Sequence, residues 1–408
     1  MYNAIVGQSG GPTAAINATL AGVITAAVES PNIGTLFGAQ NGIEGILDNR
    51  MLDLGKMFEK DDGSIDLLKL TPAAALGSCR IKLPAIDDKE KSDVYRRIFD
   101  RLKENNIGYF FYIGGNDSMD TVDKLSALAE DYGAGYMRFI GVPKTIDNDI
   151  CETDHTPGYG SAAKYIAATM QSILYDCAVY TVKSVTIVEI MGRDSGWLTC
   201  SAAVPRLNGM APDYVYLPEV PFSTDKFVSD IKKAHKIHPN VVVAVSEGIR
   251  FADGRYVGES NQNGATDVFG HKYLAGAGKT LEMIVKNEIG CKVRSFDLSL
   301  PQRCASFALS QTDIDESFGV GRFAVEAAID GESGVFITYV RHESPYRVTY
   351  KPIKIDKVAN RVKQVPSDFI NAEGNNVTDA CIDYIVPLIS GQPKIEYLNG
   401  IPAHYKIK

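Results

Sequence analysis

The sequence predicts an α/β protein with mostly parallel β-sheets that are covered by helices on both faces. Short apolar runs rich in β-branched residues alternate with helical patterns along most of the chain, and such runs are typical of strands buried on both faces of a parallel sheet. The chain has 408 residues, more than one average core holds, so two domains are expected. In such sheets ligands bind beyond the carboxyl ends of the strands.

The first half of the chain predicts four strand-to-helix units. An apolar run opens the chain, and Gly-Gly-Pro separates it from a helix of small residues. Each later unit again has an apolar strand, a polar loop and a helix. The expected strands and helices are 4–6 with 13–28, 109–113 with 118–129, 139–142 with 161–174, and 185–190 with 197–203.

The second half continues this pattern and then weakens. Strands are expected at residues 241–245, 293–298 and 335–340, and helices at 273–286 and 304–329. Roughly the last seventy residues carry more Pro, Asn and Lys and show weaker periodicity. We expect them to form a peripheral extension.

The composition excludes several classes of function. The formal net charge is −8 and no long basic run occurs, which argues against a nucleic-acid partner. Seven cysteines are scattered without a C-x-x-C pair, as is typical of reduced thiols. We expect no signal peptide before the first strand, and no apolar run reaches the roughly 18–20 residues that span a bilayer. We expect a cytoplasmic protein with no membrane partner.

Two glycine-rich turns follow predicted strands. Gly10 and Gly11 follow the first strand, and the run GGNDS at 114–118 follows the second. Glycines let backbone N–H groups approach a phosphate, and the next helix N-terminus favours anions. A tight turn without a ligand explains the first motif equally well, and a capped helix explains the second better when it is taken alone. Because both turns end strands of one predicted sheet, we favour a phosphate site.

The most informative run is Lys144-Thr145-Ile146-Asp147-Asn148-Asp149, which follows a strand. Two carboxylates two residues apart are costly to place together without a cation, and Mg²⁺ held by a carboxylate and substrate phosphates is a usual solution. A carboxylate beside an acceptor hydroxyl can take its proton, and Lys144 can neutralise a leaving phosphate. An Asx-rich surface turn is the alternative. The adjacent Pro143 and Lys144 favour phosphoryl transfer.

Three further motifs offer groups for an anionic sugar. Met191-Gly192-Arg193 and Glu247 each follow a predicted strand, and Arg294 and Arg303 lie nine residues apart around a third. Guanidinium groups suit a sugar phosphate, and a carboxylate can accept hydroxyl protons. Each arginine taken singly is more often a solvated surface charge.

These motifs, in this order over roughly the first 330 residues, resemble the phosphofructokinase family. The family's signatures correspond to SGG at 9–11, residues 38–45, LGS at 76–78 with Arg80, TIDND at 145–149 and MGR at 191–193. The resemblance implies two similar Rossmann-like domains with the active site in the cleft between them. It implies a donor domain at residues 1–155 with about 304–335, a sugar-phosphate domain at 156–303 and an extension at about 336–408 packed on the core.

The resemblance also implies phosphoryl transfer to the 1-hydroxyl of fructose 6-phosphate, with Asp147 as the general base. The sugar contacts expected beside Asp147 are Thr145, Ile146, Met191, Gly192, Arg193, Glu247 and Arg303. The donor contacts expected are Gly10, Gly11, Arg80, Gly115, Asn116 and Ser118. Arg294 matches a position that reaches the sugar phosphate of a neighbouring subunit, which implies a homodimer or homotetramer.

Mg²⁺ is the cofactor that the resemblance implies. The family's usual metal aspartate falls at Asn116, which offers only a neutral oxygen. We therefore expect ligation to shift toward Asp117, Asp149 and the donor itself, with Asn116 as a further candidate.

Asp117 and Lys144 indicate which phosphoryl donor is used. ATP-using members that resemble this chain typically carry glycine at the first position and often at the second, which leaves room for the nucleotide's α-phosphate. An aspartate fills that space and repels the phosphate, and Lys144 can stabilise the phosphate that leaves from pyrophosphate. The pair occurs in pyrophosphate-using members. The expected reaction is reversible transfer from pyrophosphate that releases phosphate, and an ATP-dependent 6-phosphofructokinase is the alternative.

Two other classes share this predicted fold. Retention of Asp147 and Asp149 counts against a catalytically dead regulatory subunit. The missing dinucleotide fingerprint counts against a Rossmann oxidoreductase, and no Walker A ending is present.

Overall fold

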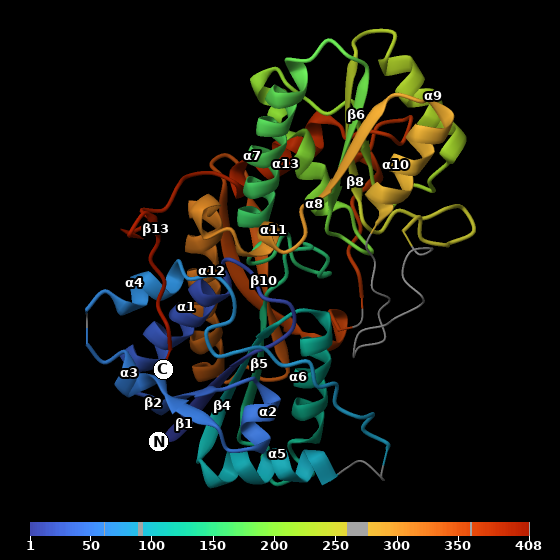
Figure 1. Cartoon of the computed structure of the whole chain (residues 1–408). Coiled ribbons are helices and arrows are strands. Elements are labelled where there is room, and N and C mark those ends of the chain that lie inside the picture. The colour runs from blue at the N-terminus through green and yellow to red at the C-terminus, as the bar shows by residue number, and fades with distance from the viewer. Residues whose placement is uncertain (61, 89–92, 259–275, 360, 408) are drawn as a thin grey trace.

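The computed structural model describes residues 1–60, 62–88, 93–258, 276–359 and 361–407. Its larger sheet lies in the lower lobe of Figure 1 and has the strand order β11-β10-β5-β4-β1-β2-β3. The strands are β1 (Tyr2–Gln8), β2 (Ile33–Ala39), β3 (Met51–Asp53), β4 (Ile107–Gly114), β5 (Arg138–Pro143), β10 (Val335–His342) and β11 (Arg347–Lys354). Only the two edge strands run antiparallel to their neighbours.

The smaller sheet lies in the upper lobe and has the strand order β7-β8-β6-β9. All its described pairings are parallel. Its strands are β6 (Ser184–Ile190), β7 (Tyr214–Tyr216), β8 (Asn240–Ser246) and β9 (Lys292–Asp297). The two sheets together confirm the predicted α/β fold with mostly parallel strands.

Helices cover both faces of each sheet because successive strand residues point to opposite faces. In β4, Phe111 packs with one set of helices and Phe110 with the other. The first set is α1 (Ile16–Glu29), α3 (Leu54–Met57), α4 (Ser64–Lys69) and α12 (Gln311–Ile329); the second is α2 (Ile43–Leu47), α5 (Asp93–Glu104) and α6 (Asn116–Leu128).

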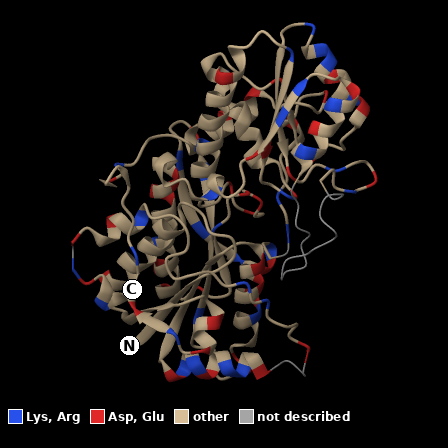
Figure 2. Ribbon diagram, in the orientation of Figure 1, with Lys and Arg blue, Asp and Glu red and all other residues tan. Residues whose placement is uncertain are grey.

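The smaller sheet is enclosed in the same way. One face packs on α7 (Tyr159–Ala178), α8 (Trp197–Cys200), the 3₁₀-helix η2 (Ser201–Asn208) and α13 (Asp379–Leu388), and the other on α9 (Thr224–Ala234) and α10 (Ala277–Glu288). Charges of both signs are interspersed on outer helices such as α5 and α9 (Figure 2). Within the described ranges, no helix is both long enough and apolar enough to cross a membrane.

One predicted helix is wrong at its start. The helix expected from residue 304 is divided into α11 (Pro301–Cys304), the 3₁₀-helix η4 (Ser306–Ala308) and α12. The Ser310 hydroxyl accepts a hydrogen bond from the backbone N–H of Asp313 and donates one to the carbonyl of Leu388 (2.7 Å). Ser310 therefore caps α12 and ends the preceding turn. Residues 273–275 of the helix expected at 273–286 lie outside the described residues.

Part of the expected extension is built into the sheets and their cover. Strand β10 pairs in parallel with β5, with Val335 opposite Ile140, and β11 follows as an antiparallel edge strand. Helix α13 packs in the core of the smaller sheet. Two late segments of the chain thus lie beside elements far earlier in the sequence, whereas the division into domains stays a prediction.

Helices α1 and α12 cross closely because each presents a glycine at the crossing. A Cβ atom added at Gly22 would lie 2.1 Å from the carbonyl oxygen of Phe318, and one added at Gly321 would lie 2.2 Å from that of Thr19. Backbone atoms cannot move aside as a flexible side chain can, so the crossing requires glycine at both places.

Gly22→Ala should therefore lower the free energy of unfolding by about 1–3 kcal/mol, since the two helices must move apart. Gly55→Ala in α3 is the matched control, because the nearest atom to its added Cβ is 3.4 Å away. Urea denaturation followed by circular dichroism measures both variants. Equal stability of the two would contradict the close crossing.

Candidate active site

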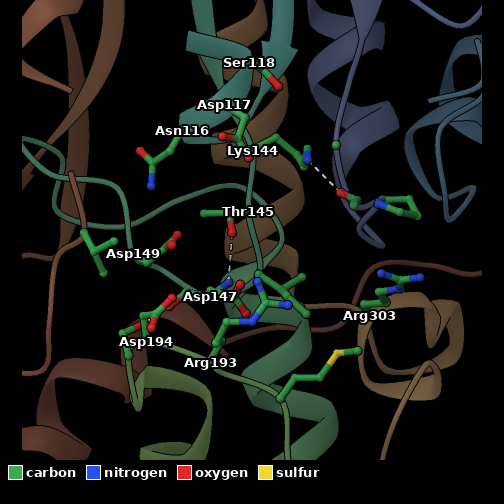
Figure 3. Close-up of a pocket in the computed structure, with 18 of the residues that line it drawn as sticks. Asn116, Asp117, Ser118, Lys144, Thr145, Asp147, Asp149, Arg193, Asp194 and Arg303 are labelled. Carbon is green, nitrogen blue, oxygen red and sulfur yellow. Dashed lines mark hydrogen bonds between the residues drawn. The ribbon is translucent and has the colours of Figure 1, made fainter. Parts of the chain in front are cut away.

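The polar loops at the carboxyl ends of both sheets surround one cavity of about 480 Å³. It is lined by Gly10, Gly11, Pro12, Arg80, Gly115, Asn116, Asp117, Ser118, Lys144, Thr145, Ile146, Asp147, Asp149, Met191, Arg193, Asp194, Ser195, Glu247, Arg303 and Val362. Every site residue predicted from the sequence is in this set except Gly192 and Arg294. In Figure 3, Lys144 and Arg303 lie on one side of the cavity, and Asp149 and Asp194 lie on the opposite side.

The turn after β1 is held open toward the cavity. Gly10 has a φ of +76°, which favours glycine. The Nζ of Lys144 donates a hydrogen bond to the carbonyl of Gly11 at 2.6 Å. Lys144 is 2% exposed, and burial lowers its pKa to about 8, against the opposite pull of Asp147 and Asp149. At neutral pH the ammonium remains mainly charged and is available to an anion.

Helix α6 begins two residues earlier than predicted, so Asn116 and Asp117 stand in its first turn and Gly115 is its N-cap residue. The free N–H groups and the dipole of this helix end favour a phosphate. The side-chain oxygen of Asn116 is buried and has no hydrogen-bond partner in the described part of the chain. A buried acceptor without a partner is the group that a cation or water would satisfy.

The loop after β5 places two carboxylates in the cavity. Burial and the nearby Asp149 raise the pKa of Asp147 to about 7, although Arg193 and Lys144 oppose this. Burial also raises the pKa of Asp149. The backbone N–H of Asp147 donates to the hydroxyl of Thr145 at 3.1 Å. The loop therefore holds one carboxylate that can accept a proton near neutral pH and a second that a cation would stabilise.

The loops after β6 and β8 meet at the other end of the cavity. The N–H of Gly192 donates to Oε1 of Glu247 at 3.2 Å, and that of Met191 donates to Oε1 of Gln302 at 3.2 Å. Burial raises the pKa of Glu247 to about 8. Gly192, at a φ of +133°, shapes this loop through its backbone. Together with Arg303, these groups form a polar pocket suited to a sugar.

Arg294 lies away from the cavity. It stands on β9 at the edge of the smaller sheet, where its Nε donates to Thr186 (3.2 Å) and its guanidinium pairs with Asp176 (3.3 Å). Arg294 is therefore not placed to contact a sugar bound in the cavity of its own subunit.

Sequence reasoning missed four lining residues, namely Pro12, Asp194, Ser195 and Val362. Asp194 and Ser195 directly follow the Met191-Gly192-Arg193 motif, so extending that motif by two residues would have found them. The hydroxyl of Ser195 donates to the carbonyl of Asp147 at 3.2 Å, which joins the two loops. Val362 comes from the C-terminal part of the chain, where the periodicity is weaker and no motif is present.

The oxygen atoms around Asn116 suit a divalent cation that the protein and the phosphates of a bound substrate hold together. Among the described residues, no group of three or more His, Cys, Asp or Glu side chains makes an all-protein metal site. The unpartnered oxygen of Asn116 and the carboxylates of Asp117 and Asp149 line the same cavity. Mg²⁺ is usually bound in this manner, through one or two carboxylates and substrate phosphates.

Known proteins resemble this chain over its whole length. The sequence model of the phosphofructokinase family matches residues 3–326. The pyrophosphate–fructose 6-phosphate 1-phosphotransferase of Methylococcus capsulatus is 37% identical over 98% of this chain and 95% of its own, and that of Xanthomonas campestris is 39% identical over 100% and 96%. The crystal structure of a pyrophosphate-dependent phosphofructokinase from Nitrosospira multiformis superposes with a TM-score of 0.88 at 34% identity, covering 99% of this chain and 95% of that one.

Proposed function

The chain belongs to the phosphofructokinase family, and we propose that it catalyses reversible phosphoryl transfer from pyrophosphate to the 1-hydroxyl of D-fructose 6-phosphate. The products of this glycolytic step are fructose 1,6-bisphosphate and phosphate. The observation that carries the choice of donor is that both Asp117 and Lys144 line this cavity. The relatives named above carry the same activity in their names.

Asp147 is the general base in this proposal. Its raised pKa, about 7, lets it take the proton of the 1-hydroxyl near neutral pH. The positive charges of Arg193 and Lys144 oppose that shift. They therefore keep Asp147 ionised in a larger fraction of the molecules, and the ionised form is the one that accepts the proton. A positioned base of this kind typically contributes about 10²–10⁴-fold to the rate.

Lys144 and the α6 N-terminus bind the donor. The ammonium already donates to the Gly11 carbonyl, so it is positioned beside the turn at which pyrophosphate would lie. It neutralises charge on the phosphate that leaves. Gly10, Gly115, Ser118 and Arg80 complete the donor contacts. Asn116, Asp117 and Asp149 would hold Mg²⁺, which the family generally uses and which supplies further neutralisation of the pyrophosphate charge.

The sugar phosphate occupies the opposite end of the cavity. Arg193 supplies positive charge there, and Thr145, Ile146, Met191 and Glu247 line the pocket. Arg303 stands between the two ends, since a Cβ atom added at Gly11 of the donor turn would lie 3.5 Å from its guanidinium group. Burial and the nearby Arg80 lower the pKa of Arg303, which reflects a site prepared for an anion. In this account residues 1–155 with about 304–335 form the donor domain and residues 156–303 form the sugar domain, and the loop with Thr145 and Ile146 reaches from the first domain to the sugar.

We also propose a cytoplasmic homodimer or homotetramer. Arg294 lies on an edge strand outside its own cavity, from which it would reach the sugar phosphate of a neighbouring subunit. This proposal and the donor assignment are independent of each other.

The function is tested by the initial rate of fructose 1,6-bisphosphate formation in the presence of Mg²⁺. With pyrophosphate as donor we expect turnover, and with ATP in its place we expect none above background. Turnover with ATP alone would keep the family and overturn the donor. Activity with neither donor would overturn the proposed reaction for the chain on its own.

A further inference from the structure

The ammonium group of Lys363 is enclosed behind the loop that carries Asp147 and Asp149. Its Nζ donates hydrogen bonds to the side-chain oxygen of Asn148 (3.3 Å) and to the carbonyls of Thr153 (3.1 Å) and Asp154 (2.6 Å). An ammonium has three N–H donors, so all three are used. Burial lowers its pKa to about 8 although Asp154 and Asp149 oppose the shift. The group therefore binds the loop through all of its donors.

The backbone of Lys363 joins this loop to the loop after β6. Its N–H donates to the carbonyl of Asp149 at 2.7 Å, and its carbonyl accepts from the indole N–H of Trp197 at 3.1 Å. Two residues later, Val365 donates to the same oxygen of Glu219 that accepts from Gly196. One short segment thus contacts the donor-side and the sugar-side loops.

Asn148 is the residue through which Lys363 acts on the carboxylates. It is fully buried and has a φ of +53°, a left-handed conformation that residues with a Cβ rarely adopt. Its side chain is fixed at both ends, since its oxygen accepts from Lys363 and its nitrogen donates to the hydroxyl of Tyr384 at 3.1 Å. Because Asn148 stands between Asp147 and Asp149, its conformation sets the direction of both carboxyl groups.

The carbonyl of Asp154, which accepts a hydrogen bond from Lys363, belongs to a densely hydrogen-bonded part of the core. His155 is enclosed between the carboxylates of Asp154 (2.8 Å) and Glu316 (2.6 Å), the latter on α12. The hydroxyl of Tyr384 donates to the carbonyl of Asp154 at 2.8 Å. Lys363 therefore connects the Asp147 loop to a hydrogen-bonded part of the core.

We propose that Lys363 is a positioning residue for phosphoryl transfer, which acts through Asn148 to keep Asp147 and Asp149 in their reactive places. This inference rests on the proposed role of Asp147 as base. Lys363 needs no contact with either substrate, because a misplacement of about 1 Å at the reacting groups can lower a rate by about 10²-fold.

Lys363→Met tests the proposal, since methionine replaces the unbranched stem of lysine and removes the three N–H donors. We expect kcat to fall by about 10–100-fold, the range found for groups that orient metal ligands. The Mg²⁺ concentration for half-maximal rate should rise, while KM for fructose 6-phosphate should stay within about twofold because Arg303 and Glu247 are untouched.

Lys164→Met is the matched control. The Nζ of Lys164 also binds three acceptors, the carbonyls of Leu309 and Gly391 and the side-chain oxygen of Gln392, and it also holds the C-terminal part of the chain. It does not line the cavity. We expect both variants to lose thermal stability, because each leaves three acceptors without their donor, and only Lys164→Met to keep the wild-type kcat.

A folded Lys363→Met variant with the wild-type kcat would overturn the proposal, and so would an equal loss of kcat in Lys164→Met. If Lys363→Met does not fold, Tyr384→Phe removes the opposite support of Asn148, and an unchanged kcat in that variant would overturn it as well. The assays use whichever donor the wild type turns over. An error in the donor is then seen in the wild type alone and does not affect the comparison of variants.

Discussion

Asp147→Asn should lower kcat by about 10²–10⁴-fold, because the amide keeps the shape of the carboxyl group but cannot take the proton of the acceptor hydroxyl. Asp147 is the carboxyl whose pKa burial raises to about 7, in the middle of the cavity. Binding of the sugar should change little, since the guanidinium groups that attract its phosphate remain. Steady-state kinetics gives kcat, and isothermal titration with fructose 6-phosphate gives the affinity.

Asp194→Asn is the control for this prediction. Asp194 lines the same cavity, but its carboxylate pairs with Arg250 and its side chain is 43% exposed. The loss of the Asp194 charge in this variant should lower kcat by less than about tenfold. Equal losses in the two variants would remove the distinct role of Asp147, and near-normal turnover in Asp147→Asn would show that another group accepts the proton.

Asp117→Gly should change the phosphoryl donor. The carboxylate stands in the first turn of α6 and lines the cavity. The family resemblance implies that the α-phosphate of a nucleotide donor would need this space. Two like charges about 4 Å apart in a partly buried site repel by about 4 kcal/mol at an effective dielectric of about 20, which corresponds to nearly three decades of affinity. The variant should gain turnover with ATP and lose turnover with pyrophosphate. Initial rates with each donor measure the switch.

Asp117→Asn separates charge from volume in this prediction. The amide occupies the space of the carboxylate but does not repel a phosphate. If charge excludes ATP, this variant should gain part of the ATP activity, and if volume excludes it, only the glycine variant should. An unchanged donor preference in both variants would show that Asp117 does not select the donor.

The strands next to the site could be predicted because their apolar runs are long and end in polar motifs. Strands β4 and β5 begin and end within two residues of the expected positions, and both polar runs that follow them line the cavity. In these places the local pattern and the tertiary environment favour the same structure. The short strands β3 and β7 have three residues each, which is too few for a period to be recognised.

The start of α6 was placed too late because Asp117 and Ser118 are both good caps. The backbone selects Gly115 instead, whose extended conformation ends the strand. A Cβ at Gly114 would lie 2.1 Å from the hydroxyl oxygen of Ser118, so the strand end and the first turn of the helix pack closely on each other. Cap preferences alone do not reveal this backbone geometry, which leaves Gly115 as the residue before the helix.

The role proposed for Lys363 could not be predicted, because it depends on contacts between residues that are far apart in the sequence. Lys363 is more than two hundred residues from Asn148 in sequence, and no motif surrounds it. Its contacts arise because β10 and β11 join the larger sheet and α13 packs beside α7. These elements bring the end of the chain behind the Asp147 loop.

The central claim, that pyrophosphate is the partner of fructose 6-phosphate in this cavity, is tested most directly in the reverse direction. The protein is incubated with fructose 1,6-bisphosphate, phosphate and Mg²⁺ without any nucleotide, and phosphorus NMR follows the products. The account predicts a growing pyrophosphate signal together with fructose 6-phosphate. No pyrophosphate under these conditions, with ATP formed once ADP is added, would contradict it.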